Sequence, residues 1–431
     1  MNALFEEFSA SNAQAWKERL AKDLKGITFE DLSIQDRNGQ TIRPFYTAED
    51  ANQSGRAVFS HKDWSIFAQI KVANEKEANA NALNELQNGV SGLSFIINTR
   101  VDIEVLLKDI QLPYIQTRFV LGSGALTFFE DWNDYVTTNK PGEIDAILIL
   151  DPIASSLKTN QWNLEKDKAE WLKNSGSTLS INATLFQNAG ACSAYQIACT
   201  LAQTNEYLNW LNEGGKIKHL KRINISTSTG TGFFEEIAKL RAFRLAIHNL
   251  IAAYGITVSV ELHVESSDTS RSAFDAYSNL LRDTLSGMSA VLGGCDSLLI
   301  HPFDQNKNEE SSLSKRMSRN QQLIMKEESY FNQIADASAG SFYIEHLTEQ
   351  LAEQGWDLFK GIEQDGGIIA SADKISAEIE QQAKQWIEEY KSGKRVLIGV
   401  NKFVDANDQP KPFNSEHFAG IQPISISEHL I

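Results

Sequence analysis

Glu261 and His263 have residue types and a spacing that could do chemistry, because they lie two apart in an expected strand. Side chains two apart on a strand point to the same face, where a carboxylate and an imidazole can exchange a proton or bind a metal ion. A mutually satisfied pair inside a barrel is the plainer interpretation, and we favour it. His301, at the expected end of another strand, is a second candidate, and no third ligand accompanies either site.

A polar cluster, Ser226–Thr231, precedes a helix that is expected to begin near Phe233. Hydroxyl groups and free amides at the start of a helix can cradle a phosphate, although an ordinary polar turn would have the same composition. The sequence contains no G-x-S-x-G, no P-loop and no H-E-x-x-H. Residue types and spacing alone therefore predict neither a catalytic set nor a metal site.

The composition excludes several classes of protein. The chain has 431 residues, with 40 Lys and Arg against 56 Asp and Glu, so its net charge is −16. An acidic chain without a block of cations is not expected to bind nucleic acid, and no apolar run approaches the roughly 18–20 residues that span a bilayer. Glu6 and Glu7 stand where a secretion signal would be basic. Together with three cysteines and no C-x-x-C, these features indicate a cytoplasmic protein.

Short β-like runs alternate with longer helical runs after an N-terminal extension. This alternation implies parallel strands joined by helical crossovers. About eight such units favour a (β/α)8 TIM barrel over a doubly wound sheet, because no G-x-G-x-x-G follows the first strand. An antiparallel sheet with one solvated face stays an alternative. The expected strands are Gly92–Asn98, Tyr114–Gly122, Ala146–Leu150, Thr178–Thr184, Arg222–Ser228, Ile256–Val264, Ser297–His301 and, more weakly, Gln333–Ala335.

Several of these strands carry small polar side chains on one face and apolar ones on the other. A standard barrel fills its interior with bulky branched side chains. If the apolar faces meet the helices here, the interior is instead a polar bore that could accept an extended polar ligand along its axis. The candidate lining residues are Ser180, Asn182, Asn224, Ser226, Ser228 and His263.

Five strings, in order along the chain, resemble motifs of the methylmalonyl-CoA mutase family. The resemblance runs from about Trp16 to Asn401. It implies a (β/α)8 barrel whose axis holds the CoA chain, followed by a cobalamin domain with a D-x-H-x-x-G cobalt ligand. The matching strings are the opening at Trp16–Gly26 with Pro44–Thr47, then Phe233–Ala242, Arg316–Glu328, Asp336–Thr348, and Gly366–Gly367 with Ile398–Asn401.

Three family positions for the substrate are replaced. The R-Q-Y-A-G-F motif aligns with Phe67–Val72, so its Arg becomes Phe67 and its Tyr becomes Gln69. In Y-H-M-Q-E-A-G-A the His becomes Leu185, which can neither donate a hydrogen bond nor a proton. Gln187 keeps the Gln of that motif and joins the candidate lining residues of the substrate channel. The resemblance therefore implies no catalytic residue and no metal ligand on this chain.

The sequence ends soon after Asn401, so we expect the chain to lack the cobalamin domain. It resembles the small, non-catalytic subunit of heterodimeric mutases, whose large subunit would bind adenosylcobalamin and interconvert methylmalonyl-CoA and succinyl-CoA. We expect residues 1–60 to form a subunit-contact arm, residues 61–403 the barrel, and residues 404–431 a tail or linker. Three alternatives stay open: a barrel that binds CoA or acyl-CoA without turnover, a fragment of a longer mutase-like chain, and an independent enzyme that uses Glu261, His263 or His301.

Overall fold

The computed structural model describes residues 11–50, 57–272, 274–305, 311–405, 407 and 417–430. Eight parallel strands form one sheet with the order β6-β5-β4-β3-β10-β9-β8-β7. Every ladder in this sheet is parallel, which confirms the TIM barrel and contradicts the antiparallel alternative. The strands are β3 Ser65–Lys71, β4 Gly92–Ile97, β5 Gln116–Leu121, β6 Asp145–Ile149, β7 Thr178–Asn182, β8 Arg222–Thr229, β9 Ser259–Ser266 and β10 Ser297–Leu299.

One predicted strand is wrong, and one strand is missing from the prediction. The first barrel strand is β3, which the sequence patterning missed because Phe67 places an apolar side chain on the polar face and obscures the alternation. Gln333–Ala335 is not a strand: a 3-10 turn covers Phe331–Gln333, and the chain then leaves Ile334 65% exposed. The eighth strand is therefore β10, and the barrel begins one unit earlier than the pattern predicted.

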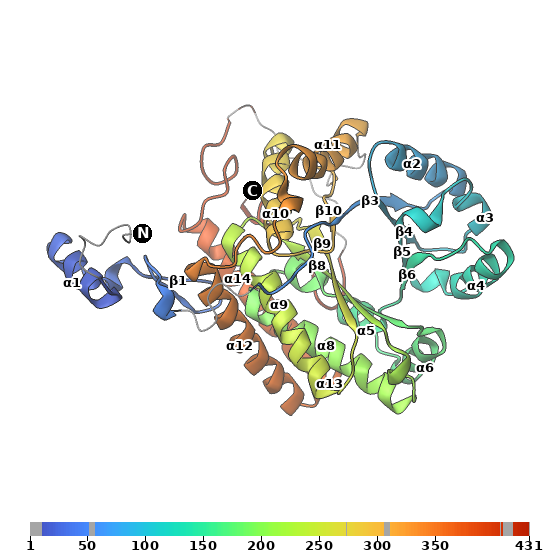
Figure 1. Ribbon diagram of the computed structural model, residues 1–431, viewed down its shortest axis with the longest axis horizontal. Helices are drawn as coiled ribbons and strands as arrows, with labels where there is room; N and C mark the ends of the chain where they lie inside the picture. Colours follow the sequence, from blue (N-terminus) through green and yellow to red (C-terminus); the bar gives the residue numbers. More distant parts are fainter. Residues whose placement is uncertain are drawn as a thin grey trace, which may run out of the picture.

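Helices cover the outside of the barrel, with an additional layer where α12 packs on α8 and α9 (Figure 1). Among the described residues, none of these helices is long and apolar enough to cross a membrane. The helices are α1 Ala13–Asp23, α2 Glu75–Gln87, α3 Ile103–Leu106, α4 Phe128–Asn139, α5 Pro152–Thr159, α6 Leu164–Asn174, α7 Thr184–Asn188, α8 Ser193–Glu213, α9 Phe233–Ala253, α10 Ala276–Leu292, α11 Ser312–Leu323, α12 Phe342–Gln364, α13 Gly367–Ala370 and α14 Ala372–Lys391.

The main core lies between the strands and the helices rather than inside the barrel. Burial of apolar side chains at this interface is the main driving force for the fold. Six outward side chains of β7, β8 and β9 are at most 1% exposed and pack in one cluster with residues of α8 and α9: Leu179, Ile181, Ile223, Ile225, Leu262 and Val264. The alternate, polar side chains of these strands are left to face the barrel axis.

The seam between β6 and β7 is closed by a side chain. Within the described residues no ladder joins these two strands. Asp151, two residues after β6, accepts hydrogen bonds from the Asn182 amide on β7 (2.7 Å) and from Tyr207 Oη on α8 (2.6 Å). Burial raises the pKa of Asp151, and these donors act against that shift. The carboxylate thus replaces the missing backbone pairing.

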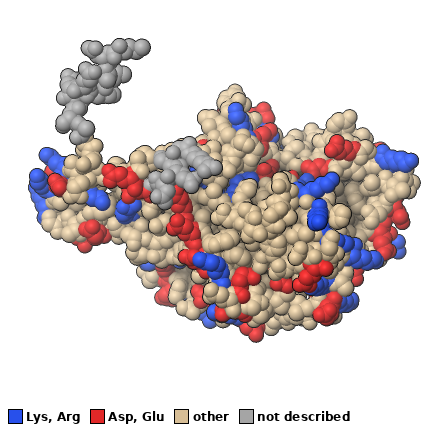
Figure 2. Space-filling view, turned by 60° about the horizontal axis from the view of Figure 1, so that its bottom comes forward, with Lys and Arg blue, Asp and Glu red and all other residues tan. Residues whose placement is uncertain are grey.

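The N-terminal arm lies apart from the barrel and is attached through a short hairpin. Helix α1 has no buried residue and stands away from the barrel in Figure 1; in Figure 2 the arm is a lobe at one end of the molecule. The hairpin pairs β1 Ile34–Gln35 with β2 Thr41–Ile42. At its tip Asn38 is buried and accepts from the Ala194 amide at the start of α8.

The C-terminal residues 417–430 pack on the barrel instead of extending away from it. The amides of Gly420 and Ile421 donate to carbonyls of α5, and the Ile426 amide donates to Thr269 O (3.0 Å) after β9. Ile426 is fully buried beside Trp386 and Tyr390 of α14. Most of the rest of the tail expected at 404–431, residues 406, 408–416 and 431, lies outside the described residues.

Candidate functional site

The six strand candidates lie on adjacent strands in matched positions. Ser180 on β7 is paired in register with Asn224 on β8, and Asn182 with Ser226. Ser226 is in turn paired with His263 on β9. The polar faces of β7, β8 and β9 therefore form one continuous wall, to which Ser228 belongs. Whether these residues contact a substrate stays a prediction.

Arg118, which sequence reasoning missed, crosses the bore from β5 to this wall. Its guanidinium donates to Asn224 Oδ1 and Ser226 Oγ, both at 2.6 Å. Arg118 is 2% exposed, and burial lowers its pKa to about 10 against the opposing charges of Glu265 and Glu261, so it is charged at neutral pH. The sequence does contain a signal for this inward-facing cation. Arg118 stands in the middle of the strand Gln116–Leu121, on the opposite face from the buried Phe119.

Phe67 and His263 fill the bore beside Arg118. Their rings meet edge to face, with centroids 5.0 Å apart. A Cβ on Gly92 of β4 would lie 2.2 Å from the Phe67 ring, so the glycine makes the space for the phenyl group. His263 is fully buried with Nδ1 2.7 Å from Ser297 Oγ, and burial holds its pKa well below the usual value. It is therefore neutral.

Arg222 occupies the end of the bore at which the strands begin. Its guanidinium pairs with Asp145 on β6 (2.6 Å) and with Glu261 on β9 (3.4 Å). The acid–base or metal pair considered for Glu261 and His263 is therefore not formed: Glu261 turns to Arg222, and His263 to Ser297. Burial raises the pKa of Glu261, and Arg222 opposes that shift.

His301 lies just beyond β10, at the end of the barrel where enzymes of this fold carry their catalytic groups. Its Nε2 is 3.1 Å from Glu265 Oε2. Burial acts to lower the pKa of His301, but the hydrogen bond and charge of Glu265 outweigh it, so the pKa is raised. Within the described chain, no three His, Cys, Asp or Glu side chains are placed to hold a metal ion.

The polar turn after β8 is satisfied by the protein itself. The Gly230 amide donates to Glu236 Oε1 (2.9 Å), where a phosphate oxygen would have to sit. The second carboxylate oxygen of Glu236 pairs with the fully buried Lys239 (2.5 Å). Gln187 lies on α7, outside the strand wall, and accepts from Lys239 Nζ (3.3 Å). Leu185, also on α7, packs against the apolar core.

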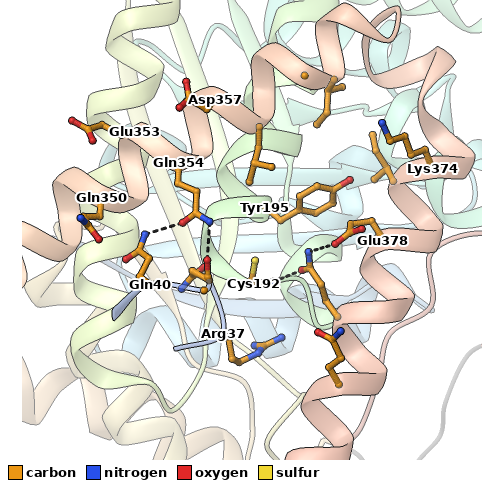
Figure 3. A pocket seen from close by; sticks show the side chains of 18 of the residues that line it. Arg37, Gln40, Cys192, Tyr195, Gln350, Glu353, Gln354, Asp357, Lys374 and Glu378 are labelled. Atoms are coloured by element: carbon orange, nitrogen blue, oxygen red, sulfur yellow. Dashed lines mark hydrogen bonds between the residues drawn. The ribbon is translucent and has the colours of Figure 1, made fainter. Parts of the chain in front are cut away.

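A groove of about 1330 Å³ lies outside the barrel between the hairpin tip, α12 and α14 (Figure 3). Gln354 of α12 ties it together by accepting from Gln40 Nε2 (2.8 Å) and donating to Asn38 O (2.7 Å). On the other wall Gln382 accepts from the Cys192 amide (2.8 Å). The contacts of Gln354 attach the arm to the barrel, and the described residues of this groove form no catalytic constellation.

Comparison with known proteins matches residues 160–421 to the methylmalonyl-CoA mutase family model. A methylmalonyl-CoA mutase small subunit of Porphyromonas gingivalis is 30% identical over 98% of this chain and 76% of its own length. A probable small subunit of Mycobacterium tuberculosis is 27% identical over 88% of this chain and 68% of its own length. The methylmalonyl-CoA mutase small subunit of Streptomyces virginiae is 26% identical over 95% of this chain and 73% of its own length.

The matched region includes β7–β10 and four of the five motif strings, and most of it lies in the barrel expected from those strings; the opening string, at Trp16–Gly26 with Pro44–Thr47, lies outside it. The chain therefore belongs to the methylmalonyl-CoA mutase family and resembles its small subunits.

Proposed function

We propose that this chain is the small subunit of a heterodimeric, adenosylcobalamin-dependent methylmalonyl-CoA mutase, and that it stabilises the large catalytic subunit without turning over substrate itself. The family and the likeness to small subunits support the assembly. One structural observation supports the absence of turnover: Arg118 spans the bore and uses Asn224 and Ser226 as its own partners.

The bore is blocked by the chain's own side chains at its start and in its middle. Arg222 with its acidic partners lies at the start of the strands, and Arg118 lies in the middle beside the paired rings of Phe67 and His263. The family positions for a substrate Tyr and His are Gln69 and Leu185, neither of which is an acid or a base. An acyl-CoA in the axis would have to displace the buried guanidinium of Arg118 and the partly buried one of Arg222, and leave their partners unpaired, which is costly.

Adenosylcobalamin, which the family implies, does not fit the imidazoles at the mouth of this barrel. A cobalt ligand needs an exposed ring nitrogen. His263 is fully buried and turned to Ser297, and the exposed fraction of the His301 side chain is 8%, with Nε2 held by Glu265. We therefore assign the cofactor to the partner subunit.

The N-terminal arm is the proposed contact with the large subunit. Its apolar side chains include Ile27, Ile34 and Phe45, which are 50%, 65% and 44% exposed. Trp16 of α1 stacks on Phe45 with centroids 4.4 Å apart, so the arm has a small aromatic cluster but no core behind it. Several exposed apolar side chains on one segment support an interface there.

The polar wall of the bore favours a second function, the binding of CoA or acyl-CoA without turnover. Acetyl-pantetheine, which carries the polar chain without phosphates, tests this by titration calorimetry. We expect no saturable binding to the wild type because Arg118 occupies the axis. Saturable binding would instead support the second function.

The decisive experiment is mutase activity with adenosylcobalamin and methylmalonyl-CoA, measured for this chain alone and mixed with the large subunit from the same source. We expect no turnover by the chain alone, and a stable, active heterodimer on mixing. Turnover by the isolated chain would contradict the proposal. Failure to form a complex that size-exclusion chromatography can detect would contradict the assembly.

A further inference from the structure

A second groove, of about 840 Å³, lies between α2 and α11 and reaches the bore beside β3. The two helices are joined at their later turns, where Arg319 Nη1 lies 2.5 Å from Glu85 Oε2. Toward their first turns the groove opens between Glu77 on one side and Ser312 on the other. It therefore opens at the end of the barrel where strands finish and ligands bind.

The lining of this groove is basic, although the chain as a whole carries a charge of −16. Four cations line it, against the two acids Glu77 and Glu85: Lys71, Lys315, Arg316 and Arg319. Glu85 and Arg319 neutralise each other, so the lining has three further cations against the single acid Glu77. Arg316 is exposed, and within the part of the chain that the structure describes its guanidinium makes no hydrogen bond or ion pair. An anion is the ligand that such a lining favours.

The buried cation at the bottom of the groove also has a hydrogen-bond donor without a partner. Arg319 is 8% exposed, and its Nε has no hydrogen-bond partner. A buried donor without a partner is uncommon and is usually satisfied by water or a ligand. Helix α11 begins at the rim with Ser311 as its N-cap, so the positive end of its dipole faces the same opening.

The floor of the groove is apolar, and its other wall carries amides. Phe67 and Leu299 form part of the floor, and Asn81 and Asn84 of α2 face the cations. Loops after the seventh and eighth strands of such barrels often bind phosphate, and β9 and β10 are those strands here. A cationic rim above an apolar floor suits an anionic group attached to an apolar or planar body.

We propose that the α2–α11 groove binds a small organic phosphate, with the phosphate at Arg316 and Arg319 and the body over Phe67 and Leu299. This site is separate from the subunit role proposed above: it meets the bore at Phe67 and Leu299, but its cations Arg316 and Arg319 lie on α11, outside the strands. Arg316 supplies the bidentate charge, and the exposure of this side chain makes it the residue to test.

The test is titration calorimetry of the full chain with pyrophosphate and with ADP, for the wild type and for Arg316→Glu. The matched control is Lys384→Glu on α14, which makes the same charge change at a side chain that is 71% exposed and far along the sequence from the groove. We expect Arg316→Glu to weaken ADP binding about tenfold or more, and Lys384→Glu to change it less than about twofold. ADP should bind more tightly than pyrophosphate, because only ADP can use the floor.

Hydrogen exchange locates the site independently, and ADP should protect residues 81–88 and 312–319. No saturable binding of either probe would overturn the proposal, and so would equal weakening by the two charge changes. Equal affinity for ADP and pyrophosphate would overturn the role of the floor. Acetyl-pantetheine carries no phosphate, so its titration reports on the bore and the ADP titration reports on the groove. A negative result in one test therefore leaves the other proposal unaffected.

Discussion

Arg118 on β5 donates a 2.6 Å hydrogen bond to Asn224 on β8, across the centre of the barrel. These strands are not neighbours in the sheet, so the bond passes through the space that a ligand in the axis would need. The alternation of polar residues in the strands predicts that Asn224 and Ser226 line a substrate channel. The same side chains that predict a channel therefore bind the residue that closes it.

We expect Arg118→Ala to lower the free energy of unfolding by about 1–3 kcal/mol, because Asn224 and Ser226 lose their partner inside a closed space. Arg118→Met should cost less, since it fills the same volume and removes the cost of burying a charge. Urea unfolding of both variants measures the difference. Equal costs for the two variants would show that Arg118 does not act by filling the bore.

Gly92→Ala should destabilise the protein by about 1–3 kcal/mol, because the new methyl group would overlap the Phe67 ring. In a Phe67→Ala background the same change should cost little, so a double-mutant cycle should report strong coupling. Gly176→Ala is the control, since a Cβ there meets nothing within 4 Å. Additive costs at Gly92 and Phe67 would contradict the packing described here.

Two motif strings of the family meet in a buried ion pair between Arg241 of α9 and Asp336. Asp336→Asn should lower the free energy of unfolding by about 3–5 kcal/mol, because it leaves the buried guanidinium without its counter-ion. Asparagine tolerates the positive φ of 43° at this position, so the charge is what changes. Asp23→Asn, at an exposed pair with Arg19, should cost less than about 1 kcal/mol. Similar costs for the two variants would argue against a buried structural pair.

His301 should make stability depend on pH through its bond to Glu265. Its pKa in the folded protein is raised, so its contribution is fully present below the unfolded pKa of about 6.5 and is lost as pH rises through the folded pKa. His301→Gln keeps a donor but not the charge. We therefore expect the wild type to exceed it in unfolding free energy by about 1–2 kcal/mol near pH 5.5, and by much less near pH 9. A difference that is independent of pH would mean that His301 is not charged beside Glu265.

Regular patterns made the fold predictable, and one irregular strand made part of it unpredictable. Polar and apolar residues alternate clearly in β7, β8 and β9, so both the barrel and its polar interior followed from the sequence. In β3, Phe67 stands on the inner face, and periodicity could not show that Gly92 leaves room for it. The seam at β6 and β7 was also beyond the pattern, because a single side chain, Asp151, closes it.

The candidate site was predictable as a surface but not as a set of contacts. The sequence predicted that Ser180, Asn224 and Ser226 lie on one wall, because alternate side chains of a strand point to the same face of the sheet. Arg118 comes from a strand on the far side of the barrel, and no local rule says where so long a side chain ends. For the same reason the pairing of Glu261 with Arg222, instead of with His263, needed the three-dimensional structure.

Ile34→Asp tests the arm as the contact with the large subunit. Ile34 is 65% exposed in β1, so the change should alter the stability of the isolated chain by less than about 0.5 kcal/mol. Burying a new carboxylate in an apolar interface should instead weaken association with the large subunit about tenfold or more. Tyr114→Asp is the matched control, because Tyr114 is 83% exposed on the barrel and not on the arm. Surface plasmon resonance with the large subunit immobilised compares the two variants with the wild type. If Tyr114→Asp weakens binding and Ile34→Asp does not, the contact lies on the barrel and the role proposed for the arm is wrong.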